Sequence, residues 1–186
     1  MVVRGEAPAA LLGPLDLPMG WFRSEVPLFV PGVLLTAALG LMLCRPLSRL
    51  LGERPWVMLL AILGLGLVVS ATLTPLVGAL EHGVISSGTC DTSRIGPAPL
   101  SSYARATDAS LNVALFVPLG LSLGLLRGRW ARHLIVLGLS LPVIVESTQL
   151  LVPVLGRGCE TADIFDNTLG LVLGLAVGHI AARVLA

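Results

Sequence analysis

The polar residues between positions 146 and 167 are the part of the sequence whose types and spacing could do chemistry. They are Glu146, Gln149, Arg157, Asp163, Asp166 and Asn167. An acid beside an arginine could act as a general acid or base on a phosphate or amide substrate, because the guanidinium can bind two oxygens at once. This stretch begins inside one long apolar run and ends inside the next. Ionisable groups at membrane depth are costly unless they are paired or hydrated, which makes these residues functional candidates.

The apolar character of the whole chain places it in the membrane class. Of its 186 residues, 55% are hydrophobic and only 12% are charged, and the mean hydropathy is strongly positive. A helix needs roughly 20 apolar residues to cross a bilayer. The sequence therefore predicts an all-α polytopic transmembrane bundle of about five helices, near residues 27–44, 56–78, 109–126, 133–154 and 164–182.

The arginines predict the orientation of this bundle, because short cytoplasmic loops are enriched in basic residues. The basic residues of the loops after the first, third and fifth predicted helices are Arg45, Arg49, Arg54, Arg127, Arg129, Arg132 and Arg183. These loops should face the cytoplasm. We therefore expect the N-terminus outside and the C-terminus inside, with residues 1–26 as an extracytoplasmic segment and residues 27–186 as the transmembrane domain.

The long connection at residues 79–107 is expected to lie outside, as a cap over the helix ends. It is rich in Gly, Ser, Pro and Thr, and it has no periodic apolar pattern. On the predicted topology this segment and the last outer loop contribute Cys90 and Cys159 to the oxidising side, whereas Cys44 lies at the inner end of the first helix. The two outer cysteines are either bonded to each other or two free thiols.

Two predicted helices begin with the same polar pattern, Asp108 with Asn112 and Asp163 with Asn167. Residues four apart share a helix face, so each pair should point in one direction. Asp108 could instead serve only as a helix N-cap, which would leave Asn112 unexplained. The third and fifth helices also carry glycines at a spacing of four, which permits close helix contact in lipid.

The three polar helix ends should meet on one side of the membrane, together with Arg157 of the connecting loop. Counted along its helix from the inner end, Glu146 lies at about 20 Å, which is about 10 Å below the outer boundary of a core about 30 Å thick. This position is too deep for a simple surface acid. Because several acids close together repel in a low dielectric, at least one should hold a proton or pair with Arg157. The alternative is a purely structural network of hydrogen bonds that holds the bundle together.

Several other kinds of site are not indicated by the sequence. It has no Gly-x-Ser-x-Gly elbow, phosphate-binding loop or His-Glu-x-x-His motif. The three histidines do not cluster, and we expect neither a metal site nor a cofactor. We also expect no nucleic-acid partner, because there is no basic stripe interleaved with aromatic residues.

Three blocks of residues, taken in order, resemble the VanZ-like family of small bacterial membrane proteins. They are Asp108-x-x-x-Asn112-x-x-x-Phe116-x-Pro118-x-Gly120, Glu146-x-x-Gln149, and Arg157-x-Cys159-x-x-x-Asp163-x-x-x-Asn167-x-x-Gly170-x-x-x-Gly174. The resemblance covers residues 108–178. It implies a multi-pass protein of the bacterial cytoplasmic membrane with a role in the cell envelope. Family members are associated with low-level resistance to the glycopeptide antibiotic teicoplanin.

The resemblance leaves two functional interpretations. In the first, the polar site binds a membrane lipid, a lipid-linked cell-wall component or the lipid tail of teicoplanin without catalysis. In the second, the protein is an outer-leaflet enzyme on a lipid phosphate or glycolipid, with Glu146 as acid or base and Arg157 as anion holder. The binding residues would be Asp108, Asn112, Gln149, Asp163, Asp166 and Asn167. Oligomeric state is not indicated by the sequence.

Overall fold

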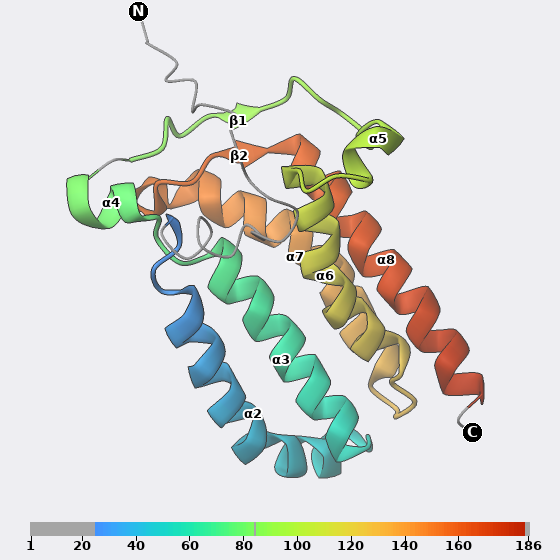
Figure 1. Cartoon of the computed structure of the whole chain (residues 1–186). Helices are drawn as coiled ribbons and strands as arrows, with labels where there is room; N and C mark the ends of the chain where they lie inside the picture. Colours follow the sequence, from blue (N-terminus) through green and yellow to red (C-terminus); the bar gives the residue numbers. More distant parts are fainter. Residues whose placement is uncertain (1–24, 84, 185–186) are drawn as a thin grey trace, which may run out of the picture.

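The computed structural model describes residues 25–83 and 85–184 as a helical bundle (Figure 1). Its five main helices are α2 Phe29–Leu51, α3 Pro55–Thr72, α6 Asp108–Gly124, α7 Ala131–Leu151 and α8 Thr161–Val184. Within the described residues, α2, α3, α7 and α8 are long and apolar enough to cross a membrane, and α6 is a shorter apolar helix. The predicted fold class is confirmed. The inside–outside orientation stays a prediction, and residues 1–24 of the expected N-terminal segment lie outside the described residues.

Three helix boundaries differ from the expectation, and local chemistry explains each. The first helix does not end near residue 44 but continues to Leu51, where Gly52 closes it with a left-handed φ of 74°. Arginine is a good helix former, so the inner arginines extend the helix. α3 ends at Thr72 and α7 at Leu151, earlier than expected. Pro75 and Pro153 follow these ends, and proline disfavours the helical conformation in the residue before it.

The segment expected as an outer cap is partly regular. It contains α4 Val77–His82, the short strand β1 Cys90–Asp91 and α5 Leu100–Tyr103. β1 pairs in parallel with β2 Cys159–Glu160, which follows the short helix η1 Pro153–Leu155. Figure 1 shows this segment crossing the end of the bundle where α7 ends and α6 and α8 begin. We call this the disulfide end, because Cys90 and Cys159 are bonded there with their Cα atoms 4.5 Å apart.

The predicted glycine seam joins α6 and α8, which run in the same direction. A Cβ atom added at Gly170, Gly174 or Gly178 would meet a backbone carbonyl of α6. Gly120 and Gly124 of α6 face carbonyls of α8 in the same way. The two backbones are therefore in direct contact, which only small residues allow.

α3 lies between α2 and α6 and contacts both through glycines. A Cβ at Gly64 would meet the backbone of Leu119 in α6, and one at Gly66 would meet Thr36 in α2. Both glycines therefore allow a neighbouring helix to approach α3 closely. α2 packs mainly on α3 and leaves most of its surface exposed.

The arginine-rich loops lie together at the opposite end of the bundle. The carboxylate of Glu53, in the α2–α3 loop, accepts backbone N–H bonds from Arg127 and Gly128 in the α6–α7 loop, at 2.5 to 3.1 Å. Bonds from two backbone amides anchor this carboxylate. The two loops that were assigned to the same side of the membrane are therefore in contact.

Candidate functional site

A cavity of about 450 Å³ lies near the disulfide end, between α3, α6, α7 and the start of α8. All of the predicted site residues line it except Asp166. Its polar lining consists of Asp108, Asn112, Glu146, Gln149, Arg157, Asp163, Asn167 and Thr72. Its apolar lining consists of Phe29, Ala71, Leu111, Ala114 and Leu115. The cavity thus combines a polar group of residues with a hydrocarbon wall, as many ligand sites do.

Glu146 is the most deeply placed acid of this lining, and its side chain is only 2% exposed. Its Oε2 atom accepts a hydrogen bond of 2.8 Å from the backbone N–H of Glu160. This bond connects α7 to β2 and fixes the orientation of the carboxylate. Such positioning suits a side chain that must present its other oxygen to a bound group.

Gln149 and Arg157 hold the end of α3 against α7 and the loop that follows it. The side-chain amide of Gln149 donates to the carbonyl of Thr72 at 3.0 Å, and Arg157 Nε donates to the carbonyl of Thr74 at 2.9 Å. These carbonyls need outside partners because α3 ends here, and Pro75 has no N–H to offer. Both side chains therefore have a structural role as well as a place in the cavity lining.

Two buried atoms of the lining have no hydrogen-bond partner among the described residues. They are Nη2 of Arg157 and Oδ1 of Asn167. Asn167 is only 2% exposed. Burial also lowers the pKa of Arg157 to about 10, with Glu146 acting in the opposite direction. Unsatisfied buried polar groups are rare and costly in native proteins, so a free donor and a free acceptor in one cavity call for an explanation.

Asp108 is not the N-cap of α6, so the interpretation of this acid as a simple cap is wrong. The capping residue is Thr107, whose hydroxyl accepts from the backbone N–H of Ser110 at 3.4 Å. The Ser110 hydroxyl in turn accepts from the Thr107 N–H at 2.9 Å. Asp108 is left exposed at the cavity, and Asn112 follows one turn later on the same face.

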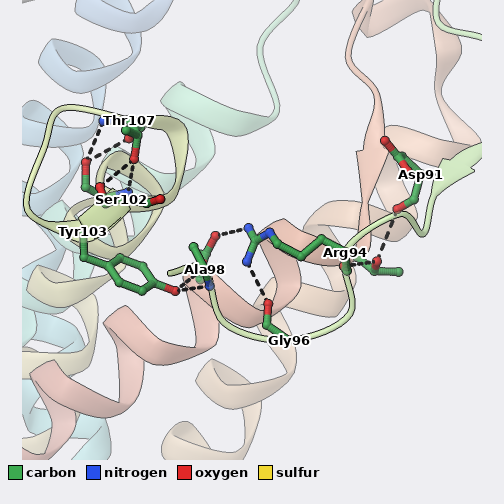
Figure 2. A network of polar contacts seen from close by, with 10 residues as sticks. Asp91, Arg94, Gly96, Ala98, Ser102, Tyr103 and Thr107 are labelled. Carbon is green, nitrogen blue, oxygen red and sulfur yellow. Dashed lines mark hydrogen bonds and ion pairs between the residues drawn. The ribbon is translucent and has the colours of Figure 1, made fainter. Parts of the chain in front are cut away.

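Asp166 is placed away from the cavity, in contact with the segment that crosses the disulfide end. Its side chain is fully buried and accepts hydrogen bonds from Arg94 and from the hydroxyl of Tyr103, each at 2.5 Å. Figure 2 shows Arg94 and Tyr103 within this network, where Arg94 also donates to the carbonyl of Gly96 and the Tyr103 hydroxyl accepts from the N–H of Ala98. Within the described structure, Asp166 thus fastens the crossing segment to α8.

Sequence reasoning missed Arg94 and Tyr103 as partners of Asp166. The pair of outer cysteines was the feature of the sequence that could have indicated these partners. A bond between Cys90 and Cys159 brings the residues that follow each cysteine close together, and Thr161 does donate to the carbonyl of Arg94 at 2.8 Å. The parallel pairing of β1 with β2 aligns the two stretches further.

The acids of the cavity are spread over several elements. No group of three or more His, Cys, Asp or Glu side chains in the described part of the chain is arranged to hold a metal ion. Asp163 is half-buried, and no side-chain hydrogen bond joins it to another described residue. Among the described residues, the lining thus contains several carboxyl groups and the guanidinium of Arg157.

A second cavity of about 450 Å³ lies deeper in the bundle, between α2, α3, α6 and α7. Its lining is apolar, with leucines from all four helices and Met58 among them. None of its described lining residues has a polar side chain that could orient a bound group. Of these two cavities, the one near the disulfide end, which we call the polar cavity, is therefore the candidate functional site.

A comparison with known proteins gives a family match over the part of the chain that contains most of the cavity lining. The profile of the family described as VanZ/LLP1 matches residues 89–182, which include the crossing segment from Thr89 onward, α6, α7 and most of α8. No curated protein and no solved structure matches the chain.

Proposed function

The chain belongs to the VanZ-like family, and we propose that this membrane protein binds the headgroup of a lipid-linked envelope component or lipoglycopeptide in its polar cavity. The arginine-rich loops predict that this site lies at the outer leaflet of the bacterial cytoplasmic membrane. The ligand would be held without chemical change.

The observation that carries this proposal is that two residues of the cavity lining each have a buried polar atom without a partner among the described residues. Arg157 Nη2 and Asn167 Oδ1 are buried and lack partners in the described protein. A buried group without a partner costs about 1–3 kcal/mol. A ligand that supplies an anionic oxygen to Arg157 and a donor to Asn167 would remove that cost.

The apolar wall favours an amphipathic ligand over a soluble one. Phe29, Leu111 and Leu115 line the cavity alongside the polar residues. α2 and α6, which contribute these side chains, are both helices of the apolar bundle. An acyl or prenyl chain could remain in the bilayer against this wall while its headgroup contacts Arg157.

A purely structural network explains only part of the site. Glu146, Gln149 and Arg157 do bond backbone groups of other elements, which supports a structural contribution. Asn167 has no such bond within the described residues, although it is nearly inaccessible. A residue kept only for stability at this position would be better apolar, because an unpaired amide in a low-dielectric region is destabilising.

Substitution of Asn167 by leucine separates binding from structure. If the proposal is right, Asn167→Leu keeps or raises the thermal stability of the purified protein, because it removes an unpartnered polar atom, but it loses function. Ser122→Ala is the matched control, because Ser122 is buried in α6 outside the cavity and its hydroxyl donates to the carbonyl of Leu119 within the same helix. Function is measured as the inhibitory concentrations of teicoplanin and vancomycin for a susceptible bacterial host that expresses each protein at equal membrane levels.

The expected result is protection against teicoplanin, and not vancomycin, by the wild type and Ser122→Ala, with loss of protection by Asn167→Leu. Equal protection by all three proteins would exclude the polar cavity as the working site. No protection by the wild type would show that the family's association with resistance does not extend to this chain.

A second candidate function is catalysis at the outer leaflet, and the position of Glu146 favours it. This acid lines the cavity together with Arg157, and its carboxylate is held by the Glu160 N–H. It could act as acid or base on a lipid phosphate or glycolipid. Glu146→Gln keeps the shape and can still accept the Glu160 bond. Binding should therefore survive this substitution, whereas proton transfer should not.

A further inference from the structure

We propose that the cavity selects a phospholipid headgroup that carries a primary ammonium group as well as its phosphate, as phosphoethanolamine does. This inference rests on the proposed function, because it concerns the ligand of the same site. It specifies the chemical class of the headgroup and predicts which membrane lipids bind more weakly.

The charges around the cavity favour a headgroup that is not purely anionic. Among the described residues, the lining has one guanidinium, that of Arg157, and the carboxyl groups of Asp108, Glu146 and Asp163. A phosphate bound to Arg157 would compensate the positive charge and leave acids around it. A cationic group attached to that phosphate would be attracted to these acids, whereas a second anionic group would be repelled.

The buried acceptor of Asn167 favours a cation that can donate a hydrogen bond. Oδ1 of Asn167 is buried and needs a hydrogen-bond donor. A primary ammonium supplies both a positive charge and N–H donors. A trimethylammonium group has the charge but no donor, so it would leave this oxygen unpaired.

The positions of these groups on the helices support a single combined site. Asp163 and Asn167 are one helical turn apart on α8 and both line the cavity. The acceptor of Asn167 and the carboxylate of Asp163 can therefore share one ammonium group. Arg157 precedes both residues in the loop that leads into α8. Its Nε atom donates to Thr74, and its Nη2 atom, which has no partner among the described residues, is the donor that we assign to the phosphate.

Lipids that differ in one feature of the headgroup test this proposal. Phosphatidylethanolamine has both a phosphate and an ammonium donor. Phosphatidylglycerol has hydroxyl donors but no cation, and phosphatidylcholine has a cation but no donor. The three lipids, with identical acyl chains, would be titrated separately onto the detergent-purified full-length protein, and bound lipid would be counted by native mass spectrometry. Soluble phosphoethanolamine would be the fourth probe.

The expected result is that phosphatidylethanolamine binds at least about tenfold more tightly than the other two lipids, as one extra charge-assisted hydrogen bond would predict. Asn167→Leu should lose this preference while it keeps residual binding. Arg157→Lys should weaken all three lipids, because lysine cannot replace a planar donor held at a fixed position. Ser122→Ala should bind like the wild type.

The outcomes that overturn the proposal also separate it from the proposed function. Equal binding of the three lipids, with dependence on Arg157, would reject the ammonium preference but keep headgroup binding in the cavity. Lipid binding that is the same in wild type, Arg157→Lys and Asn167→Leu would reject both. Soluble phosphoethanolamine that binds as tightly as the lipid would reject a membrane lipid as the source of the headgroup.

Discussion

The hydroxyl of Tyr103 donates a 2.5 Å hydrogen bond to Oδ1 of Asp166, although 63 residues separate them in the chain. The other carboxylate oxygen of Asp166 accepts from Arg94. One buried acid of α8 therefore holds two points of the segment that crosses the disulfide end. This contact and the disulfide attach that segment at separate places.

Loss of the Asp166 carboxylate should loosen the crossing segment. Asp166→Ala removes the shared acceptor of Arg94 and Tyr103, and we expect it to cost about 1–3 kcal/mol of unfolding free energy. Thermal unfolding of the purified protein measures this effect. Arg105→Gln is the control, because Arg105 lies in the same segment with an exposed side chain. A melting temperature unchanged by Asp166→Ala would contradict the fastening role.

Tyr103 should ionise at a higher pH than an ordinary tyrosine. Burial raises its pKa above 10.0, and the hydrogen bond to Asp166 raises it further. Since the folded pKa exceeds the unfolded one, this stabilisation is complete below pH 10.0 and is lost as the pH rises through the folded pKa. Tyr103 is the single tyrosine of the chain, so ultraviolet absorbance of the phenolate reports it alone. Asp166→Asn should lower the measured pKa, and an unchanged titration would argue against this contact.

The disulfide should contribute strongly to stability, because it closes a loop between residues 69 apart. Replacing both Cys90 and Cys159 by serine should cost about 2–4 kcal/mol. Thiol labelling of the denatured protein checks the bond directly. One thiol, that of Cys44, should react before reduction, and all 3 cysteines should react after it. Labelling of all three without reduction would show that the bond is absent.

The glycine seam should not tolerate even a methyl group. Gly174→Ala would place its Cβ against the Val117 carbonyl and within 2.7 Å of the Leu121 nitrogen. Both are backbone atoms that cannot rotate away, so we expect a loss of about 1–3 kcal/mol. A Cβ at Gly158 would meet nothing within 4 Å, which makes Gly158→Ala the control. Equal melting temperatures for the two variants would contradict the close packing of α6 and α8.

The orientation of the bundle can be tested with reporter fusions at the C-terminus. The arginine loops predict a cytoplasmic C-terminus, so a fused fluorescent protein that folds only in the cytoplasm should fluoresce. A fused alkaline phosphatase, which needs an oxidising compartment, should be inactive. The opposite pattern would place the disulfide end on the reducing side, where its bond would not be expected to persist.

Much of the candidate site could be predicted from the sequence, because the membrane restricts how the chain can fold. If five predicted spans alternate in direction, the start of α6, the end of α7 and the start of α8 are expected on one side. That requirement brings Glu146, Asn112 and Asn167 toward one another without any knowledge of packing. The structure adds that they line a single cavity.

Prediction from the local sequence was less reliable where two neighbouring residues suit the same structural role. Asp108 and Thr107 are both suitable N-caps, and the structure selects Thr107 because Ser110 completes a reciprocal pair with it. Likewise, Asp163 and Asp166 are neighbouring acids at the start of α8. Only Asp163 lines the cavity, because the rotation of α8 about its axis turns Asp166 toward Arg94.

The sequence by itself determined the class of protein, the number of main helices, the glycine seam and the set of polar residues at one end. These features depend on the hydrophobicity, the glycine spacing and the charges of short stretches of sequence. They can therefore be predicted without knowledge of the tertiary structure. The tertiary structure decided which polar atoms have partners. Among the described residues, Arg157 Nη2 and Asn167 Oδ1 have no partner, and whether a buried atom has one depends on the positions of several helices at once.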